Sequence, residues 1–468
     1  MTAGPLAEAA DELAFVRTIA GEVARHGGRA LVVGGHVRDA LLGVTSKDLD
    51  LEVFGLDAEA LKALLGAWGT VNTVGESFTV FKVRGLDVSL PRRESKVGRG
   101  HKGFEVHGDP SLSFAEAARR RDFTINAIGW DPLTGEYLDP HGGRDDLARR
   151  VLRMVDARTF ADDSLRVLRA LQFAARFECT LHPETARVCR SIALDDLPAE
   201  RIWGELEKLL LRAARPSIGL HLARDLAVVA RLWPALEALH GCPQDAEWHP
   251  EGDVWVHTAM VVDQAASRQH GLPYPQRASL LLGALLHDIG KPLVTAWIDG
   301  RIRSPGHEAE GVQPATALLD ALQVHSLDGY DVRGQVLALV QWHMLPGAWW
   351  KASAPVSDGA FRRLARKVDM VLLARVSEAD CNGRTGAFDC SFSQWFLDRV
   401  AALGVEHAAP APLLLGRHLI ALGVAPGPHM GEILRAVYDR QLDGVVTTLE
   451  DAQQAAAELR TASPAPRG

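Results

Sequence analysis

The sequence predicts an α/β domain in the N-terminal third of the chain, followed by a remainder that is almost wholly helical. Up to about residue 150, short apolar runs alternate with helical patterns, and this order favours an α/β fold. Beyond about residue 155, apolar residues recur at helical spacing in one segment after another. With 468 residues, the chain is long enough for about three domains.

The predicted elements of the N-terminal region follow one another at short intervals. A first helix is expected over residues 6–27, because its apolar side chains recur at helical spacing. Strands are expected at four short apolar runs: residues 30–33, 49–54, 78–83 and 86–90. Between them, residues 37–42 fit one or two helical turns, and Asp57 is expected to cap a helix that runs to Leu65.

The rest of the chain contains a series of amphipathic segments. The expected helices include residues 162–177, 200–212, 218–226, 257–268 and 277–287. Residues 410–412 are expected to form a linker, and helical spacing resumes beyond them to about residue 460. The stretch from about 245 to 390 is rich in His and Asp, so it is a second place to look for chemistry.

Composition and charge exclude several classes of protein. Hydrophobic residues make up 47% of the chain and charged residues 24%, so a sizeable core is expected and wholesale disorder is not. A net charge of -8 argues against a chain that only coats nucleic acid. Basic residues are nevertheless concentrated in residues 92–102 and 119–121, and local charge is what attracts phosphate.

Cysteine usage and the distribution of apolar residues indicate the compartment. The five cysteines include no C-x-x-C pair, so neither a structural zinc site nor disulfides are expected, as in a reducing compartment. No run of eighteen apolar residues predicts a membrane span, and the N-terminus lacks the features of a signal peptide. We therefore expect a cytoplasmic protein that does not contact membranes.

A Gly-Gly turn precedes the first group of charged motifs. Gly34 and Gly35 follow the strand expected at residues 30–33 and precede a short helix. Glycines let the backbone approach a phosphate closely, and the helix N-terminus offers unpaired N–H groups. Arg38, in the first helical turn, can add a charge-assisted contact. Taken alone, such a turn is weak evidence.

Three aspartates are the candidate catalytic residues. Asp48 and Asp50 are two residues apart on an expected strand, so their side chains point to the same face. Adjacent carboxylates repel unless cations lie between them, and paired Mg²⁺ ions could align an attacking hydroxyl with a leaving pyrophosphate. Asp87, on another expected strand, is the candidate for the third carboxylate. A polar strand end is the alternative interpretation of this pattern.

Five motifs in order resemble one known family. They are GGHVRDALLG at residues 34–43, KDLD at 47–50, RRDFTINA at 120–127, DSLRVLRA at 163–170 and ERIWGEL at 200–206. Over about residues 28 to 215 the chain resembles the bacterial-type (class II) CCA-adding tRNA nucleotidyltransferase and poly(A) polymerase family. The resemblance implies a polymerase-β-like α/β nucleotidyltransferase head followed by an all-α neck, body and tail.

The resemblance also implies roles for individual residues. It assigns nucleotide binding to Gly35, Arg38, Arg121, Asp122, Asn126, Asp163, Arg166 and Arg169. Arg121 would contact the triphosphate and Asp122 the ribose hydroxyls, while Asp163 and Arg166 would present a Watson–Crick-like edge to the base. The family usually has Glu-Asp where this chain has Asp162-Asp163. Residues 92–103 correspond to a mobile loop implicated in the switch from C to A addition.

Histidines and aspartates form a second constellation. His257, the His287-Asp288 pair and Asp380 resemble the four ligand positions of the HD phosphohydrolase superfamily, and His307 and His343 are candidates for additional ligands. Imidazole and carboxylate ligands suit Mg²⁺, Mn²⁺ or Ni²⁺. The resemblance implies metal-activated water attacking a phosphate ester, in 2′,3′-cyclic phosphodiesterase, 2′-nucleotidase and phosphatase reactions.

These motifs divide the chain into four expected domains and indicate its function. They are a nucleotidyltransferase head at 1–150, a helical neck and body at 151–245, an HD domain at 246–390 and a tRNA-binding tail at 391–468. We expect CMP and AMP to be added from CTP and ATP to the 3′ end of tRNA without a nucleic-acid template. The alternatives are a poly(A) polymerase, an enzyme that adds only CC or only A, and an HD phosphohydrolase with an inactive head.

Overall fold

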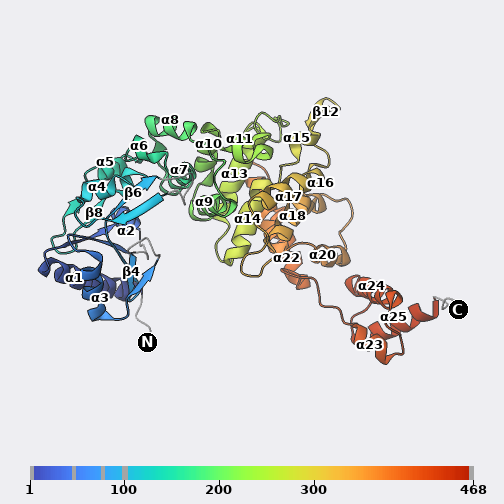
Figure 1. Cartoon of the computed structure of the whole chain (residues 1–468). Coiled ribbons are helices and arrows are strands. Elements are labelled where there is room, and N and C mark those ends of the chain that lie inside the picture. The colour runs from blue at the N-terminus through green and yellow to red at the C-terminus, as the bar shows by residue number, and fades with distance from the viewer. Residues whose placement is uncertain (1–4, 45–48, 75–79, 97–103, 463–468) are drawn as a thin grey trace. The chain divides into compact units, whose positions relative to one another are not determined.

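The computed structural model describes residues 5–44, 49–74, 80–96 and 104–462 (Figure 1). Asp48 therefore lies outside the described residues. The chain divides into two compact units, one comprising Met1–Leu209 and Ile218–Leu232, the other Leu210–Ser217 and Trp233–Gly468. Within the described part, every helix is too short or too polar to cross a membrane.

The first unit contains a mixed sheet of seven strands in the order β3-β4-β5-β2-β1-β8-β9. These strands are β1 (Arg29–Val33), β2 (Asp50–Phe54), β3 (Asn72–Val74), β4 (Val80–Val83), β5 (Leu86–Ser89), β8 (Gly129–Trp130) and β9 (Tyr137–Leu138). The β2–β5 pair is parallel, whereas β1 pairs with β2 and with β8 in antiparallel register. An α/β head was predicted, and the structure confirms it.

Helices cover the two faces of this sheet, and alternation along the strands decides which side chains meet which helix. On β1, Ala30 and Val32 pack into one apolar cluster with α1 (Pro5–Arg25) and α3 (Ala58–Leu65). Leu31 and Val33 face the other way, into a cluster with α4 (Phe114–Ala118). Asp57 caps α3 as predicted, accepting a hydrogen bond from the backbone N–H of Ala60 at 2.8 Å.

The other helices of the first unit lie between the strands of the sheet and after them. They are α2 (Gly35–Leu41), η1 (Gly66–Trp68), η2 (Thr124–Asn126), α5 (Gly143–Ala148), α6 (Ala157–Phe160), α7 (Leu165–Phe177), α8 (Pro183–Ser191), α9 (Ala199–Arg212), α10 (Pro216–Asp225) and α11 (Val228–Leu232), with the last residues of α9 and the first of α10 in the second unit. A helix was expected from residue 162, but α7 begins at Leu165. The carboxylate of Asp163 accepts the backbone N–H of Leu165, which holds the chain in a turn there.

The segment expected to be a loop at residues 92–103 begins instead as a strand. Residues Arg92–Lys96 form β6, which pairs with β7 (Phe104–Gly108) in antiparallel register. An ion pair of 2.7 Å between Arg93 Nε and Asp109 Oδ2 supports this pairing. Residues 97–103 lie outside the described part.

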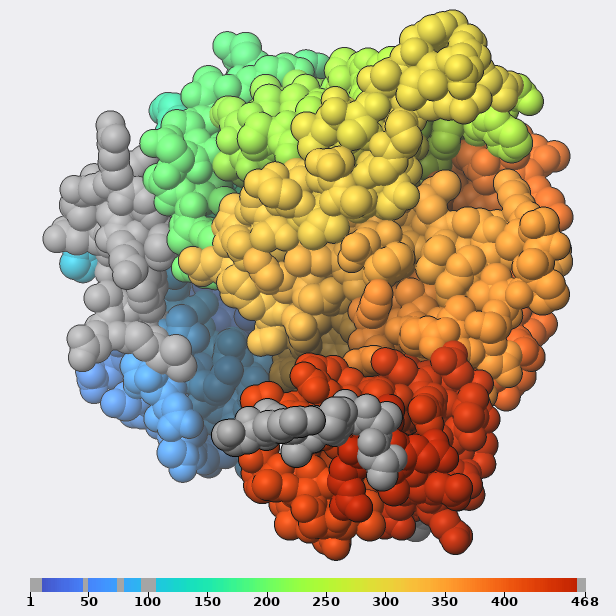
Figure 2. Space-filling model, turned by 90° about the vertical axis from the view of Figure 1, so that its right-hand side faces the viewer, coloured from blue at the N-terminus to red at the C-terminus, as the bar shows by residue number. Residues whose placement is uncertain are grey.

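The second unit is helical apart from the β12 (Ala296–Ile298) and β13 (Arg301–Arg303) hairpin. Its helices are α12 (Pro234–Glu237), α13 (Val254–Ser267), α14 (Tyr274–Leu286), α15 (Lys291–Val294), α16 (His307–Glu310), α17 (Val312–Ala321), α18 (Val332–Trp342), α19 (Leu345–Trp350), α20 (Asp358–Leu364), α21 (Met370–Asn382), α22 (Phe392–Leu403), α23 (Gly416–Ala421), α24 (Pro428–Leu442) and α25 (Leu449–Ala462). The hairpin projects from the surface of this unit, in yellow at the top of Figures 1 and 2.

Helix α14 is the centre of the second unit. Residues 278–286 are all buried, because this segment is apolar on every side. At Gly283, a Cβ atom would lie 2.8 Å from a methyl carbon of Leu339, so glycine is required for the close approach of α14 to α18. The helix ends directly before His287 and Asp288, and its packing therefore fixes the position of both side chains.

The expectation that the chain has no disulfides is wrong for one cysteine pair. Cys381, at the end of α21, is bonded to Cys390, and the chain between them forms a closed loop. The fold brings the two residues together because α21 ends at Asn382 and the loop turns back towards it. The spacing of nine residues gave no sign of this in the sequence. Cys179, Cys189 and Cys242 are free and buried.

Candidate active sites

The parallel pairing of β2 with β5 brings two of the predicted carboxylates together. Asp50 is the register partner of Asp87, so the two side chains lie on adjacent strands at the same level of the sheet. Asp87 Oδ1 is also 3.1 Å from Lys82 Nζ. The predicted third aspartate, Asp48, falls in the part of the chain that is not described.

The Gly34 turn lies directly against this pair. Gly34 has a φ of +77°, a conformation that favours glycine. A Cβ atom at this position would lie 3.1 Å from Arg121 Nη1 and 3.8 Å from Asp50 Oδ2. Only a glycine therefore leaves room between the guanidinium and the carboxylate. The structure thus brings the glycine turn, Asp50 and Arg121, all of them predicted site residues, to one place.

Arg38 is held by protein groups in this structure. Its guanidinium is buried and donates to Asn126 Oδ1 at 2.6 Å. It also pairs with Asp39 at 2.6 Å and lies 4.4 Å from the ring centre of Phe177. Arg38 therefore joins α2 to η2 and α7.

Asp122 is the centre of a buried hydrogen-bond network. It accepts hydrogen bonds from the backbone N–H of Phe123, from Asn126 Nδ2 and from Arg169 Nε, the last at 2.6 Å. Burial alone would raise the pKa of Asp122, but the charge of Arg169 and these hydrogen bonds lower it overall. Asp122 is therefore a carboxylate with a fixed orientation.

The side chains of Asp163 and Arg166 do not pair with each other, although the backbone N–H of Arg166 donates to the carbonyl of Asp163 at 3.1 Å. Asp163 Oδ2 accepts from Arg201 at 3.1 Å, and Arg166 donates to the backbone carbonyls of Thr159 and Arg120 at 2.9 and 2.6 Å. A guanidinium has five N–H donors. The two carbonyls therefore orient Arg166 and leave further donors for another partner.

The predicted HD ligands converge in the second unit. His257 Nε2 lies 3.0 Å from Asp380 Oδ1, and His287 Nε2 lies 3.1 Å from Asp288 Oδ2. The other oxygen of Asp288 faces His307 at 3.2 Å and His343 at 3.9 Å. Asp288 Oδ2 also lies 3.8 Å from His257 Nε2. Each oxygen of Asp288 therefore faces two histidines: Oδ2 faces His257 and His287, and Oδ1 faces His307 and His343.

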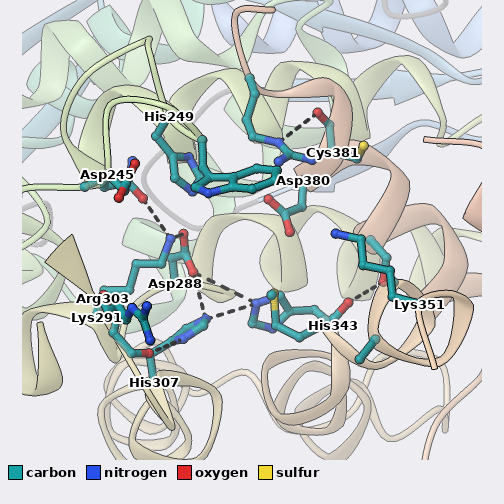
Figure 3. A pocket seen from close by; sticks show the side chains of 18 of the residues that line it. Asp245, His249, Asp288, Lys291, Arg303, His307, His343, Lys351, Asp380 and Cys381 are labelled. Atoms are coloured by element: carbon teal, nitrogen blue, oxygen red, sulfur yellow. Dashed lines mark hydrogen bonds and ion pairs between the residues drawn. The ribbon is translucent and has the colours of Figure 1, made fainter. Parts of the chain in front are cut away.

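Four members of this cluster, Asp288, His307, His343 and Asp380, line a pocket of about 660 Å³ (Figure 3). Figure 3 shows Asp288, His307 and His343 close together, with Asp380 across from them. Lys291 Nζ lies 2.6 Å from Asp288 Oδ2. The pocket has the size typical of sites for small organic ligands. Its lining combines basic side chains, such as Lys291 and Arg303, with side chains that can ligate a metal.

Comparison with known proteins shows the family to which the chain belongs. Residues 30–153 match the family described as the poly A polymerase head domain. The chain is 39% identical over 419 residues to the multifunctional CCA protein of Xanthomonas campestris pv. campestris (strain B100), which covers 86% of this chain and 95% of the relative. The multifunctional CCA protein of Xylella fastidiosa (strain M23) is 37% identical, and the match covers 78% of this chain and 86% of that protein. The chain belongs to the multifunctional CCA protein family.

Solved structures agree with the fold of this family. The CCA-adding enzyme of Bacillus stearothermophilus in complex with CTP superposes with a TM-score of 0.63 at 23% identity, over 98% of this chain and 99% of that one. The Thermotoga maritima CCA-adding enzyme complexed with tRNA superposes with a TM-score of 0.58 at 18% identity, over 96% of each chain. This chain therefore shares the fold of these structures, a polymerase-β-like head followed by a mainly helical body.

The donor atoms at the HD cluster fit a divalent metal. His287 Nε2 is buried and lies 3.1 Å from Asp288 Oδ2, yet among the described residues neither atom makes a hydrogen bond, so both point to a shared ligand. A buried ring nitrogen without a partner is costly unless a ligand uses it. The surrounding donors are imidazole nitrogens and carboxylate oxygens, which suit Mn²⁺, Ni²⁺ or Mg²⁺. In the head, carboxylate oxygens alone suit Mg²⁺.

Sequence reasoning missed two buried acids that orient these sites. Glu52 is fully buried and pairs with Arg120 at 2.9 Å and with Arg121 at 3.6 Å. It lies on the same face of β2 as Asp50, so two-residue periodicity was the signal that could have found it.

The second missed acid, Glu251, is in the loop before α13. Its Oε1 accepts hydrogen bonds from His249 Nδ1 at 2.9 Å and His257 Nδ1 at 2.8 Å. Burial would raise the pKa of Glu251, but the hydrogen bonds from the two histidines lower it well below its usual value. Glu251 therefore fixes the ring of His257 with Nε2 towards the cluster. Its sequence surroundings gave no sign of this role.

Proposed function

We propose that this chain adds CMP and AMP, from CTP and ATP, to the 3′ end of tRNA without a nucleic-acid template. The observation that supports this most directly is the register pairing of Asp50 with Asp87 beside the Gly34 turn and Arg121. A carboxylate pair next to a phosphate-accommodating turn is the arrangement that nucleotidyl transfer needs. Membership of the multifunctional CCA protein family supports tRNA as the acceptor.

In this proposal, Asp48, Asp50 and Asp87 hold Mg²⁺. When bound, Mg²⁺ lowers the barrier to transfer by stabilising the charge on the attacking and leaving oxygens. The 3′ hydroxyl oxygen of the tRNA forms a bond to the α-phosphorus, and the bond from that phosphorus to pyrophosphate breaks. Gly34 and Gly35 let the triphosphate approach the backbone, and Arg121 neutralises its charge.

The neighbouring residues select the nucleotide. Asp122, held in place by Arg169 and Asn126, accepts hydrogen bonds from the ribose hydroxyls. Asp163 and Arg166 contact the base edge with the lone pairs and N–H donors that their protein partners leave unused. Arg38 acts through Asn126, because the two side chains are joined by a hydrogen bond of 2.6 Å.

The second unit supports a second activity, a metal-dependent phosphohydrolase. His257, His287, Asp288 and Asp380 hold the metal, and His307 and His343 add donors at the other oxygen of Asp288. A bound metal would lower the pKa of water, so that the water loses a proton near neutral pH and becomes a nucleophile towards the phosphorus of the ester, from which the alcohol leaves. Lys291, which ends in the pocket beside Asp288, neutralises the phosphate. The proposed substrates are 2′,3′-cyclic phosphates and 2′-phosphates.

Two assays test these functions. Purified protein is incubated with Mg²⁺, CTP and ATP on tRNA substrates that end at the discriminator base, in C or in CC, and the products are sequenced. We expect every product to end in CCA, whereas CC-only, A-only or long A-rich products would identify one of the alternatives. The absence of any incorporation contradicts the proposal. Release of phosphate from adenosine 2′-monophosphate in the presence of Mg²⁺, Mn²⁺ or Ni²⁺ tests the phosphohydrolase.

A further inference from the structure

The walls of the HD pocket carry aromatic and cationic side chains that hydrolysis of a simple phosphate ester does not require. The floor contains four of the proposed metal ligands, Asp288, His307, His343 and Asp380, together with Lys291, and these suffice to hold and neutralise one phosphate. Further out, the lining includes Trp248 and Lys351. Their presence indicates that the ligand extends beyond the reacting phosphate.

Trp248 is an exposed aromatic plane with a restricted orientation. Trp248 is 43% exposed, although tryptophan side chains are on average largely buried. The ring of Phe388 is stacked against it, with centroids 6.3 Å apart and an interplanar angle of 27°. Phe388 is itself covered by the guanidinium of Arg384 at 4.2 Å. The contact with Phe388 therefore restricts the orientation of the indole.

Lys351 places a positive charge over the face of the Trp248 ring, at the end of a long and flexible side chain. Its Nζ lies 5.6 Å from the centre of the Trp248 ring. Figure 3 shows Lys351 directed into the pocket from the side opposite Lys291 and Arg303. Within the described residues, no carboxylate is paired with Lys351, so its charge is available to a ligand.

We infer that Trp248 and Lys351 form a nucleotide-recognition wall for the end of an RNA chain. The base of the terminal nucleotide stacks on Trp248 while its phosphate lies on the floor, and Lys351 contacts the phosphate that links it to the preceding nucleotide. Stacking suits any base, because every base has a π-face. This inference rests on the proposed phosphohydrolase activity and adds the residues that restrict it to nucleotides.

The test compares three phosphate monoesters on the full chain loaded with Mn²⁺ or Ni²⁺. Glycerol 2-phosphate has no base, adenosine 2′-monophosphate has one base, and the dinucleotide ApA with a terminal 2′-phosphate adds an internucleotide phosphate. W248A is expected to raise KM for both nucleotides by about 5- to 150-fold, as loss of a base–aromatic stack does, and to leave glycerol 2-phosphate unchanged. W248F retains a ring and is expected to recover part of the loss.

K351Q is expected to reduce kcat/KM about 10-fold or more for the dinucleotide alone, because a charged contact to its second phosphate is lost. The matched controls are W297A and K367Q. Trp297 is 72% exposed on the β12–β13 hairpin, and Lys367 Nζ lies 4.8 Å from the Trp342 ring, yet neither residue lines the pocket. Both control variants should behave like the unaltered protein.

Equal losses on all three substrates in W248A, or unchanged KM for both nucleotides, would overturn the inference. If the unaltered protein hydrolyses none of the three esters, the phosphohydrolase proposal fails, and the wall is then judged by binding. Adenosine 2′-monophosphate is titrated calorimetrically into the unaltered protein and into W248A. The nucleotidyltransferase head is the same in both proteins, so any binding there cancels in the comparison. Weaker binding to W248A supports the wall, and identical binding contradicts it.

Discussion

The two sites of this chain are assembled by different means. In the head, Asp50 and Asp87 come together through strand register, and Asp50 is exposed at the start of β2. In the second unit, His257, His287 and Asp288 are almost completely buried at helix ends that the packing of α14 fixes. The candidate site in the head is therefore partly exposed to solvent, whereas the histidine–aspartate cluster is preassembled beneath a pocket. Since the sites lie in separate compact units, their activities should be separable.

The largest expected effect separates the two activities completely. D50A removes a carboxylate from the register pair with Asp87, and we expect nucleotide incorporation to fall more than about 1,000-fold, because metal stabilisation worth several kcal/mol is lost. Phosphate release should be unchanged. The reciprocal variant, D288N, should stop phosphate release and leave incorporation intact. Incorporation of labelled CMP and release of phosphate measure the two activities, and a variant that loses both would contradict the comparison.

A large effect on stability is expected in the first unit. E52Q leaves the guanidinium groups of Arg120 and Arg121 without their buried partner. Breaking such a pair costs about 3–5 kcal/mol, so we expect the unfolding transition of the first unit to shift to lower denaturant concentration. The motif that carries Arg121 should also lose its position, and incorporation should fall. The control E59Q alters an exposed carboxylate on α3 and should change neither quantity.

Motif spacing predicted which side chains meet, because each motif depends on local geometry. The two-residue period predicted that Asp48 and Asp50 lie side by side, but Asp48 is outside the described residues. The motifs around Gly34, Asp50 and Arg121 were assigned to one site, and the structure brings these three residues together. The His287-Asp288 pair was predicted to join His257 and Asp380 because those four residues resemble a known ligand set.

Partners that come from distant parts of the chain could not be predicted in this way. Glu251 reaches His257 from a loop, and Asp163 pairs with Arg201 across 38 residues, contacts that only tertiary packing determines. The Cys381–Cys390 bond was missed for the same reason, since it depends on how the loop after α21 returns. An odd cysteine count had argued against any pairing.

An intermediate effect is expected at the HD cluster. E251Q removes the charge that holds His257 with its Nε2 towards Asp380. Replacing an outer partner of a metal-ligating histidine usually costs about 10- to 100-fold in metal affinity or activity. We expect the bound Mn²⁺, measured after dialysis by elemental analysis, to fall together with phosphate release. E310Q, an exposed acid on α16, is the matched control, and an equal loss in that variant would show that the effect is general.

The smallest expected effect concerns the loop closed by the disulfide. C390S opens the bond to Cys381, and the loop carries Arg384 and Phe388, which support Trp248 in the pocket wall. The metal ligands are held by helix packing and stay in place, so kcat should change little while KM for adenosine 2′-monophosphate rises. A reductant should have the same effect on the unaltered protein and none on C390S, and incorporation should be insensitive to both. A reductant effect that persists in C390S would assign the sensitivity to another thiol and leave the loop without a role in substrate binding.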